Sequence, residues 1–306
     1  MTIEKNQLKG FIYGIISSAT FGLIPLFALP ALKAGIGLES VMLYRFGIST
    51  LAIGAYLILR GESLKVSLKE FITLFFLGTF YASTALFLTA SYLYIPSGIA
   101  TTIHFLYPVV VSAIMIIIFR ERVSKTVMGA SLMALAGVWL ISSSESGGTF
   151  NMKGMIFVLS TVVTYALYIV GVNKSIVAKM DGLKMTFFVL LSSTIVFIIN
   201  LLISGEPLAS IPDMQTGINL FLLAIIPTLV SDFTLILAIQ HIGSTKTAVL
   251  GCMEPVTAVI TGILIFHEKM ELSQFLGIGI ILLAVTGVIL GSNRKPAQEN
   301  VQLKDK

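Results

Sequence analysis

The chain has little charge and few reactive side chains. Of its 306 residues 11% are charged, and it contains one cysteine, three histidines and one tryptophan. Cys252 alone cannot form an internal disulfide, and no Cys/His cluster with metal-ligand spacing occurs. The motifs GxSxG and HExxH and the phosphate-binding P-loop are also absent. We therefore expect no metal, no cofactor, no direct drive by ATP and no catalytic set of a membrane enzyme.

Apolar residues are what the chain has in excess. They make up 56% of it, and its mean hydropathy is +0.97. A soluble core of this length could not hide so much apolar surface, and a helix needs about 20 apolar residues to cross the hydrocarbon of a bilayer. The sequence therefore predicts an all-α membrane protein. Its ten predicted transmembrane helices lie at residues 10–29, 40–59, 71–91, 97–119, 125–143, 154–173, 185–204, 217–240, 245–266 and 272–291.

Lysine and arginine placement predicts the orientation. With the N-terminus in the cytoplasm and ten crossings, the outside segments hold only Lys33, Lys153 and Lys269, and nearly all other cations lie inside. The positive-inside rule therefore predicts that both termini are cytoplasmic. This bias accounts for the net charge of +5, so we expect no nucleic-acid partner.

The second half of the chain repeats the first. An offset of 147 residues aligns Pro108 with Pro255 and Glu121 with Glu268 without a gap. Five helices per repeat is an odd number, so the two halves should have opposite orientations in the membrane. Inverted repeats are typical of alternating-access carriers, which bind a small-molecule substrate near the midplane between the repeats.

Several of the aligned segments resemble a known family. They are Leu106-Tyr107-Pro108 with Phe119-Arg120-Glu121, Met253-Glu254-Pro255 with Phe266-His267-Glu268, and Tyr44-Arg45-Phe46. They resemble the drug/metabolite transporter superfamily, specifically two EamA domains in tandem. The resemblance covers about residues 10–292.

The resemblance implies two five-helix repeats and a carrier. The repeats would span 10–143 and 153–292, joined by a linker at 142–151 and followed by a cytoplasmic tail at 293–306. Such a protein would be a multi-pass protein of the bacterial inner membrane. It would export amino acids or similar small metabolites, although the resemblance does not identify the cargo.

Two prolines and the residues around them are the first site candidates. Pro108 and Pro255 remove a backbone donor near the middle of the fourth and ninth helices, so we expect kinks that free carbonyls to line a cavity.

The face of each proline-bearing helix carries further candidates. On the ninth helix Gly251 and Glu254 share a face, and the matching face of the fourth carries His104 and Tyr107. Dry helix packing is the alternative interpretation, since small residues are enriched there.

Two carboxylates lie deep in the predicted spans. Either Glu254 or Asp232 could bind a substrate amine or carry a coupling proton, while facilitated exchange is equally allowed. The structural alternative is a hydrogen bond from Glu254 to a neighbouring helix. For Asp232 it is an ion pair or hydrogen bond to Arg45 or His104.

Arg45 is the only cation well inside a span. It could contact an anionic group of the substrate. The alternatives are snorkelling to the membrane interface and pairing with a structural partner. A zwitterionic cargo would pair its amine with Glu254 or Asp232 and its carboxylate with His104 or Arg45. Four aromatic residues could serve as stacking walls for the cargo, or simply as core residues or interfacial anchors: Tyr81, Tyr107, Tyr165 and Trp139.

Two alternative functions stay open at this point. A related carrier of sugar phosphates or nucleotide sugars would need several cations facing its cavity, and a membrane enzyme would need clustered acidic or histidine motifs.

Glycines at 277, 279, 287 and 291 of the last helix indicate either close packing or a homodimer face.

Overall fold

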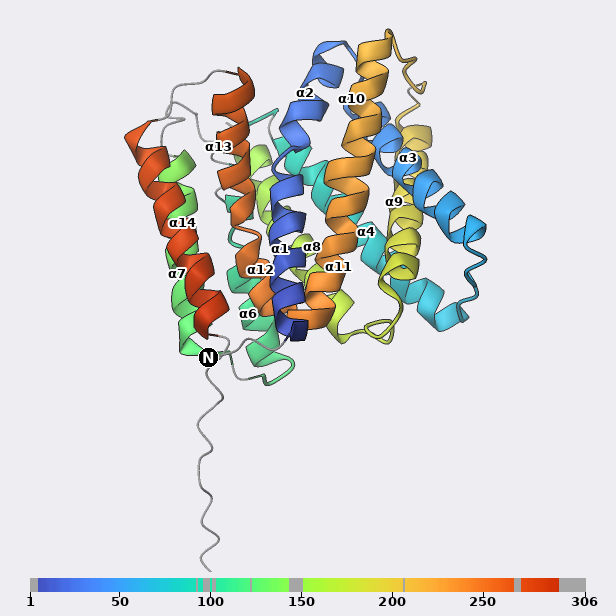
Figure 1. Cartoon of the computed structure of the whole chain (residues 1–306). Coiled ribbons are helices and arrows are strands. Elements are labelled where there is room, and N and C mark those ends of the chain that lie inside the picture. The colour runs from blue at the N-terminus through green and yellow to red at the C-terminus, as the bar shows by residue number, and fades with distance from the viewer. Residues whose placement is uncertain are drawn as a thin grey trace, which may run out of the picture.

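The computed structural model describes residues 5–91, 93–95, 100, 103–121, 123–142, 151–205, 207–266 and 271–291. Helices joined by turns and short loops make up this part of the chain, with no strand in it (Figure 1). The predicted tail 293–306, most of the predicted linker 142–151, and His267 to Lys269 lie outside the described residues. The helices are α1 (Lys5–Phe21), α2 (Ile24–Lys33), α3 (Leu38–Leu59), α4 (Leu68–Ser91), α6 (Tyr107–Ile117), α7 (Lys125–Ser142), α8 (Met152–Lys174), α9 (Gly182–Ser204), α10 (Met214–Ala224), the π-helix η1 (Ile225–Val230), α11 (Ser231–Ile242), α12 (Ser244–Leu250), α13 (Met253–Phe266) and α14 (Leu272–Gly291).

The helices have the length and composition that a bilayer requires. Within the described residues, eight helical segments are long and apolar enough to cross a membrane, and two of the predicted spans appear as shorter apolar helices, α6 and α7. The predicted all-α membrane fold is therefore confirmed.

Several of the spans predicted as one helix are interrupted. The first is divided into α1 and α2 at Gly22-Leu23, and α2 continues to Lys33. The two site prolines stand in the first turns of new helices, Pro108 in α6 and Pro255 in α13. The expected mid-helix kinks are thus wrong in detail. Proline favours a helix start because the first-turn N–H groups have no intrahelical acceptor, so its missing donor costs nothing there.

Side-chain caps fix two helix starts at one end of the bundle. Asn151 accepts hydrogen bonds from the amides of Lys153 and Gly154 at the start of α8, and Asp213 accepts from Thr216 at the start of α10. The bonds from Thr216 hold the pKa of Asp213 below its ordinary value. The carboxylate therefore stays ionised and capping at neutral pH.

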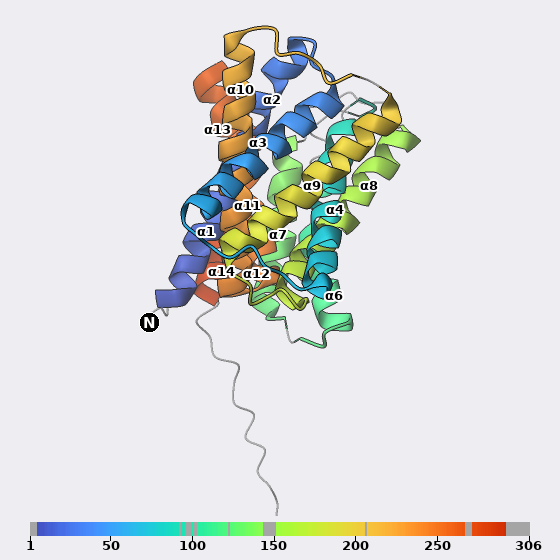
Figure 2. The same ribbon diagram turned by 90° about the vertical axis from the view of Figure 1, so that its right-hand side faces the viewer.

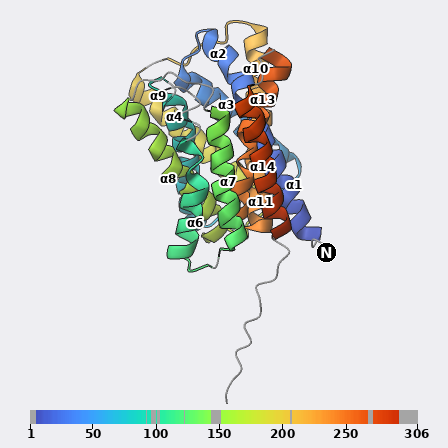
Figure 3. The ribbon, with the colours of Figure 1, turned by 90° about the vertical axis from the view of Figure 1, so that its left-hand side faces the viewer.

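Helices from the two halves of the chain pack against each other. α4 lies between α8 and α9, α3 lies along α9, and α1 lies along α11 (Figures 1 and 2). α7 and α14 run side by side along their length (Figure 3). A Cβ placed on Gly277 would lie 2.6 Å from the carbonyl oxygen of Gly137, so the predicted close packing at Gly277 occurs within the chain. The main cluster of buried apolar side chains includes residues of both halves, and two smaller clusters lie beside it.

Candidate substrate site

The π-helical turn η1, between α10 and α11, positions two of the predicted site residues, Arg45 and Asp232. Pro227 lies inside η1 and lacks the N–H group that a regular helix would direct to an earlier carbonyl. The hydroxyl of Thr228 donates to the carbonyl of Leu223 at 2.8 Å, and the hydroxyl of Ser49 donates to the carbonyl of Ala224 at 2.7 Å. Side chains thus satisfy the carbonyls that the irregular turn exposes, and α11 restarts immediately before Asp232.

Arg45 points into the bundle. Its side chain is 4% exposed, and Nε donates a hydrogen bond of 2.6 Å to the Thr228 hydroxyl. The snorkelling alternative is therefore wrong, because the threonine of the π-turn holds the guanidinium inside the protein. This bond uses one of the five N–H groups of the side chain. The carboxyl groups of Asp232 and Glu254 both interact electrostatically with the guanidinium of Arg45.

Asp232 is completely buried and only half satisfied. Its Oδ1 accepts a hydrogen bond of 2.5 Å from the hydroxyl of Tyr168, and its Oδ2 has no hydrogen-bond partner among the described residues. The expected structural partner, Arg45 or His104, is thus replaced by a tyrosine of α8. A buried carboxylate oxygen without a donor is costly, so this atom is available to a ligand that brings its own N–H.

Tyrosine rings connect Asp232 to the proline-bearing helices. Tyr81 stacks on Tyr168 with 5.0 Å between ring centroids, and Tyr168 lies 6.3 Å from Tyr165. Tyr165 in turn meets Tyr107 edge-on at 4.7 Å. The hydroxyl of Tyr81 is buried without a hydrogen-bond partner among the described residues. We call these four side chains the tyrosine row.

His104 lies at the far end of this row. The side chain is buried, and its ring centroid is 5.4 Å from that of Tyr165 and 5.3 Å from that of Tyr107. Nδ1 lies 2.9 Å from the hydroxyl of Thr161, which itself donates to the carbonyl of Val158. Because that hydroxyl has one proton, Nδ1 must be the donor, and in a neutral ring Nε2 is then an acceptor.

Gly251 and Tyr107 form the contact between the two interrupted helices. The Tyr107 hydroxyl donates to the carbonyl of Ala248 at 3.1 Å, and a Cβ on Gly251 would lie 1.7 Å from that hydroxyl oxygen. Gly251 therefore makes room for the tyrosine of the other half. Glu254, one turn later, is partly buried and acts electrostatically on Tyr107 and Tyr165.

The structure thus brings all seven predicted binding residues to one region between the halves. It adds Tyr168, Thr228 and Thr161, which the sequence analysis did not select. The spacing of residues along the sequence of α8 could have indicated two of them, Thr161 and Tyr168. Thr161, Tyr165 and Tyr168 follow the i, i+4, i+7 spacing of one helix face. Thr228 has no such signal, since its role depends on the π-turn.

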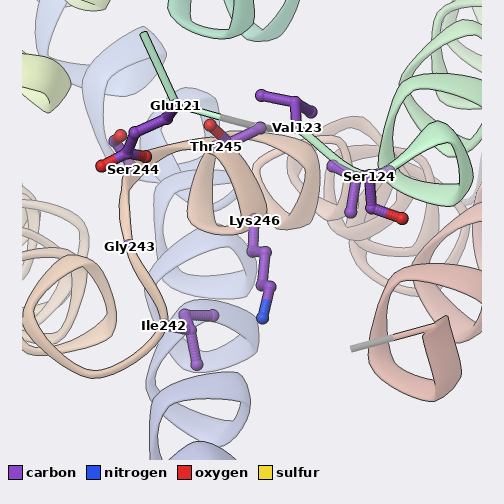
Figure 4. Close-up of a pocket in the computed structure, with 9 residues that line it drawn as sticks. Glu121, Val123, Ser124, Ile242, Gly243, Ser244, Thr245 and Lys246 are labelled. Atoms are coloured by element: carbon purple, nitrogen blue, oxygen red, sulfur yellow. The ribbon is translucent and has the colours of Figure 1, made fainter. Parts of the chain in front are cut away.

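A separate pocket lies at the end of the bundle where the α11–α12 connection passes the segment after α6 (Figure 4). Its volume is about 180 Å³. Its lining residues are Glu121, Val123, Ser124, Val127, Ile242, Gly243, Ser244, Thr245 and Lys246. Figure 4 shows Glu121 and Ser244 next to each other, with Lys246 extending away from them. Glu121 forms an ion pair with Lys174 of α8, and none of these residues belongs to the tyrosine row.

Comparison with known proteins gives a consistent picture. The model of the EamA-like transporter family matches residues 8–143 and again 152–290. The chain is 25% identical over 272 residues to YedA of Escherichia coli K12, an uncharacterized inner membrane transporter, covering 86% of this chain and 87% of that protein. It is 25% identical over 246 residues to an uncharacterized transporter of Archaeoglobus fulgidus, covering 80% and 86%.

A solved structure supports the fold. One crystal structure superposes on the chain with a TM-score of 0.80 at 16% identity, covering 92% of this chain and 96% of the other. At that identity the likeness concerns the fold alone.

Proposed function

Because the chain belongs to the EamA-like transporter family, a family of membrane transporters, we propose that it carries a small zwitterionic metabolite, such as an amino acid, out of the cell. The observation that carries this proposal is the buried grouping of Arg45, Asp232 and Tyr81 between the two halves. Two of its polar atoms, Asp232 Oδ2 and the Tyr81 hydroxyl, have no protein partner among the described residues.

The grouping suits a cargo that has both an amine and a carboxylate. A substrate amine would donate to Asp232 Oδ2, and a substrate carboxylate would accept from Arg45 and from the Tyr81 hydroxyl. Glu254 offers a second acidic partner for the amine. Nε2 of His104 is an acceptor, so it also suits the amine, and the predicted pairing of His104 with the substrate carboxylate is not part of the proposal. Stacking on the tyrosine row would hold the apolar part of the cargo. A phosphorylated cargo would instead need several cations here, whereas the described grouping sets one arginine beside two acids.

The proposed architecture is a pair of inverted five-helix repeats with ten spans. Its support is the symmetry of the contacts: α1–α11 corresponds to α8–α4, and α3–α9 and α7–α14 each pair equivalent helices. Rocking of the halves about the buried grouping would expose it alternately to each side. Both termini would be cytoplasmic in an inner membrane, as the cation distribution favours.

Coupling to protons through Asp232 or Glu254 is part of the proposal, with facilitated exchange as the alternative. Deep carboxylates are the usual proton carriers in transporters. A homodimer would use the outward glycines of α14, since a Cβ added to Gly279 would have nothing within 4 Å of it.

The test uses purified full-length protein reconstituted in liposomes. A thermal-shift screen with amino acids first identifies a stabilising cargo, because a ligand that prefers the folded state raises the unfolding temperature. Transport of that cargo is then compared with its N-acetyl and its amide derivatives. We expect each blocked derivative to be transported at least tenfold more slowly, about the effect of one charge-assisted hydrogen bond. Equal transport of a blocked derivative would refute two-ended recognition.

A further inference from the structure

An apolar groove opens on the side of the bundle, away from the tyrosine row. Its volume is about 350 Å³. The lining residues are Ala52, Ile53, Tyr56, Leu183, Leu229, Val230 and Phe233, contributed by α3, α9, η1 and α11. The Tyr56 side chain is 45% exposed, so the groove is accessible from outside the bundle.

The groove leads to the end of the bundle where α3 finishes and α9 begins. Tyr56 is in the last turn of α3, which ends at Leu59, and Leu183 is the second residue of α9. In the proposed topology this end faces the cytoplasm. The groove therefore lies in the inner leaflet, where the surrounding solvent is lipid hydrocarbon.

Two cations lie next to lining residues at this end of the groove. The guanidinium of Arg60 lies over the ring of Tyr56, 5.4 Å from its centroid. Lys184 directly follows the lining residue Leu183, and its Nζ donates to the carbonyl of Lys65 at 2.6 Å. That bond fixes one of the three N–H groups of the ammonium. One cation thus contacts a lining side chain, and the other directly follows a lining residue in the sequence.

Two acids near Lys184, Asp181 and Glu70, already accept hydrogen bonds from neighbouring groups. Asp181 accepts from the amide of Lys184 at 3.1 Å and caps α9. Glu70, which acts electrostatically on Lys184, accepts from both the amide and the hydroxyl of Ser67.

We propose that this groove binds an anionic phospholipid of the inner leaflet. One acyl chain occupies the groove, and the phosphate contacts Arg60 and Lys184. The apolar lining matches a hydrocarbon chain, and basic residues between transmembrane helices on the cytoplasmic side suit anionic headgroups. The inference depends on the proposed topology and is independent of the cargo.

The bound chain would support the π-turn that organises the candidate site. Leu229 and Val230 belong to η1 and form part of the groove wall, and the preceding residue, Thr228, holds Arg45. An acyl chain in the groove would therefore pack against the outer side of η1. The inner side of η1 faces the buried grouping of Arg45, Asp232 and Tyr81.

The test measures lipid preference by fluorescence quenching in liposomes. The full-length Tyr56→Trp/Trp139→Phe variant carries its only tryptophan at the groove. Brominated phosphatidylglycerol and brominated phosphatidylcholine with identical acyl chains serve as quenchers. We expect phosphatidylglycerol to bind about fivefold or more tightly at this position, since one cation near the headgroup contributes about a fivefold factor. The wild-type protein is the matched control, because its only tryptophan, Trp139, is 60% exposed on α7, away from the groove.

Two sets of variants in the same reporter background identify the cause. Arg60→Gln with Lys184→Gln should abolish the preference, while Lys125→Gln, an exposed cation of α7, should leave it unchanged. Ala52→Phe should fill the groove and reduce quenching. The control Leu51→Phe changes an exposed neighbouring residue and should not reduce quenching. Equal quenching by the two lipids at position 56, or a preference that survives loss of both cations, would overturn the proposal. Transport is not measured, so failure here leaves the proposed cargo untouched.

Discussion

At the residue scale, the carboxylate of Asp232 is held by one protein hydrogen bond. Tyr168 donates to Oδ1, and Oδ2 has no partner among the described residues. The first half of the chain has Ala85 at the aligned position, so the common scaffold does not require an acid here. A residue that is buried, acidic and half satisfied inside a membrane protein is better explained by a ligand or a proton than by packing.

Asp232→Asn should fold and transport with altered cargo preference or altered pH dependence. Asparagine retains an oxygen for Tyr168 but removes both the charge and the titration. We expect transport of a zwitterionic cargo to fall by about tenfold to a hundredfold, as for loss of a charge-assisted hydrogen bond. Uptake into liposomes across a range of pH measures this, with exposed Asp213→Asn as the matched control. An unchanged pH profile with unchanged cargo preference contradicts the functional role, and collapse in detergent indicates a structural one.

Tyr168→Phe should destabilise the protein itself. The change removes the only described donor to a buried carboxylate while keeping the ring that stacks on Tyr81. We expect a loss of about 1–3 kcal/mol, seen as a lower unfolding temperature in detergent. Tyr56→Phe, at a 45% exposed position, is the control and should melt like the wild type. A wild-type melting temperature for Tyr168→Phe would show that the bond to Asp232 contributes little.

At the element scale, the helices are interrupted where the two halves meet. α12 and α13 are separated at Gly251-Cys252, and the corresponding turn before α6 is at Phe105-Leu106. Both interruptions directly precede a proline-bearing first turn. The contact between them is the Tyr107 hydroxyl above Gly251, so one missing side chain allows the two elements to approach.

Gly251→Ala should disrupt this contact, and Tyr107→Phe should relieve the disruption. The new Cβ would meet the tyrosine oxygen at 1.7 Å, whereas the nearest ring carbon, Cζ, is 3.0 Å away. We expect Gly251→Ala to lower the yield of folded protein and its transport, and the double variant to recover a substantial part of both. Gly279→Ala is the control, because nothing lies within 4 Å of its Cβ position. If Gly251→Ala behaves like Gly279→Ala, the close packing at this junction is not required.

His104→Gln and Glu254→Gln together test whether the two interrupted elements line one cavity. Each change preserves side-chain bulk, and each residue acts on Tyr107 or lies beside it. We expect transport in liposomes to fall at least tenfold in each variant with normal protein yield, as for loss of a polar contact to the substrate. Normal transport by both would exclude them from the site, and lost yield together with lost transport would favour a structural role.

At the scale of the whole molecule, the two halves are interleaved rather than set side by side. The first half supplies Arg45 and Tyr81, and the second supplies Thr228, Tyr168 and Asp232. Neither half alone could therefore form the grouping. α1 begins at the same end of the bundle as the α8–α9 connection (Figure 1).

Topology can be tested with single cysteines in a Cys252→Ala background. Cys252 is the only native cysteine, so its removal leaves the introduced cysteine as the only thiol to be labelled. We expect Ser146→Cys to react with an impermeant thiol reagent on intact cells, and Ser63→Cys to react only after permeabilisation. Labelling with the opposite pattern would reverse the orientation and would also place the proposed lipid groove in the outer leaflet.

The sequence by itself determined the all-α membrane class, the approximate position of the apolar segments and the family. These follow from hydropathy, from charge placement and from local motifs such as Tyr107-Pro108 and Glu254-Pro255, all of which are read within a few residues. It also indicated which buried polar residues are site candidates, because such residues are rare in apolar helices.

Only the tertiary structure decided how those residues are paired. The Arg45–Thr228 bond joins positions 183 residues apart, and the Tyr168–Asp232 bond joins positions 64 apart. Side-chain direction at η1 depends on a π-turn, which shifts the helical phase in a way that no spacing rule anticipates. The choice between a snorkelling Arg45 and a buried one is likewise decided by a neighbouring helix, because the free energy of burial depends on the partner that is present there.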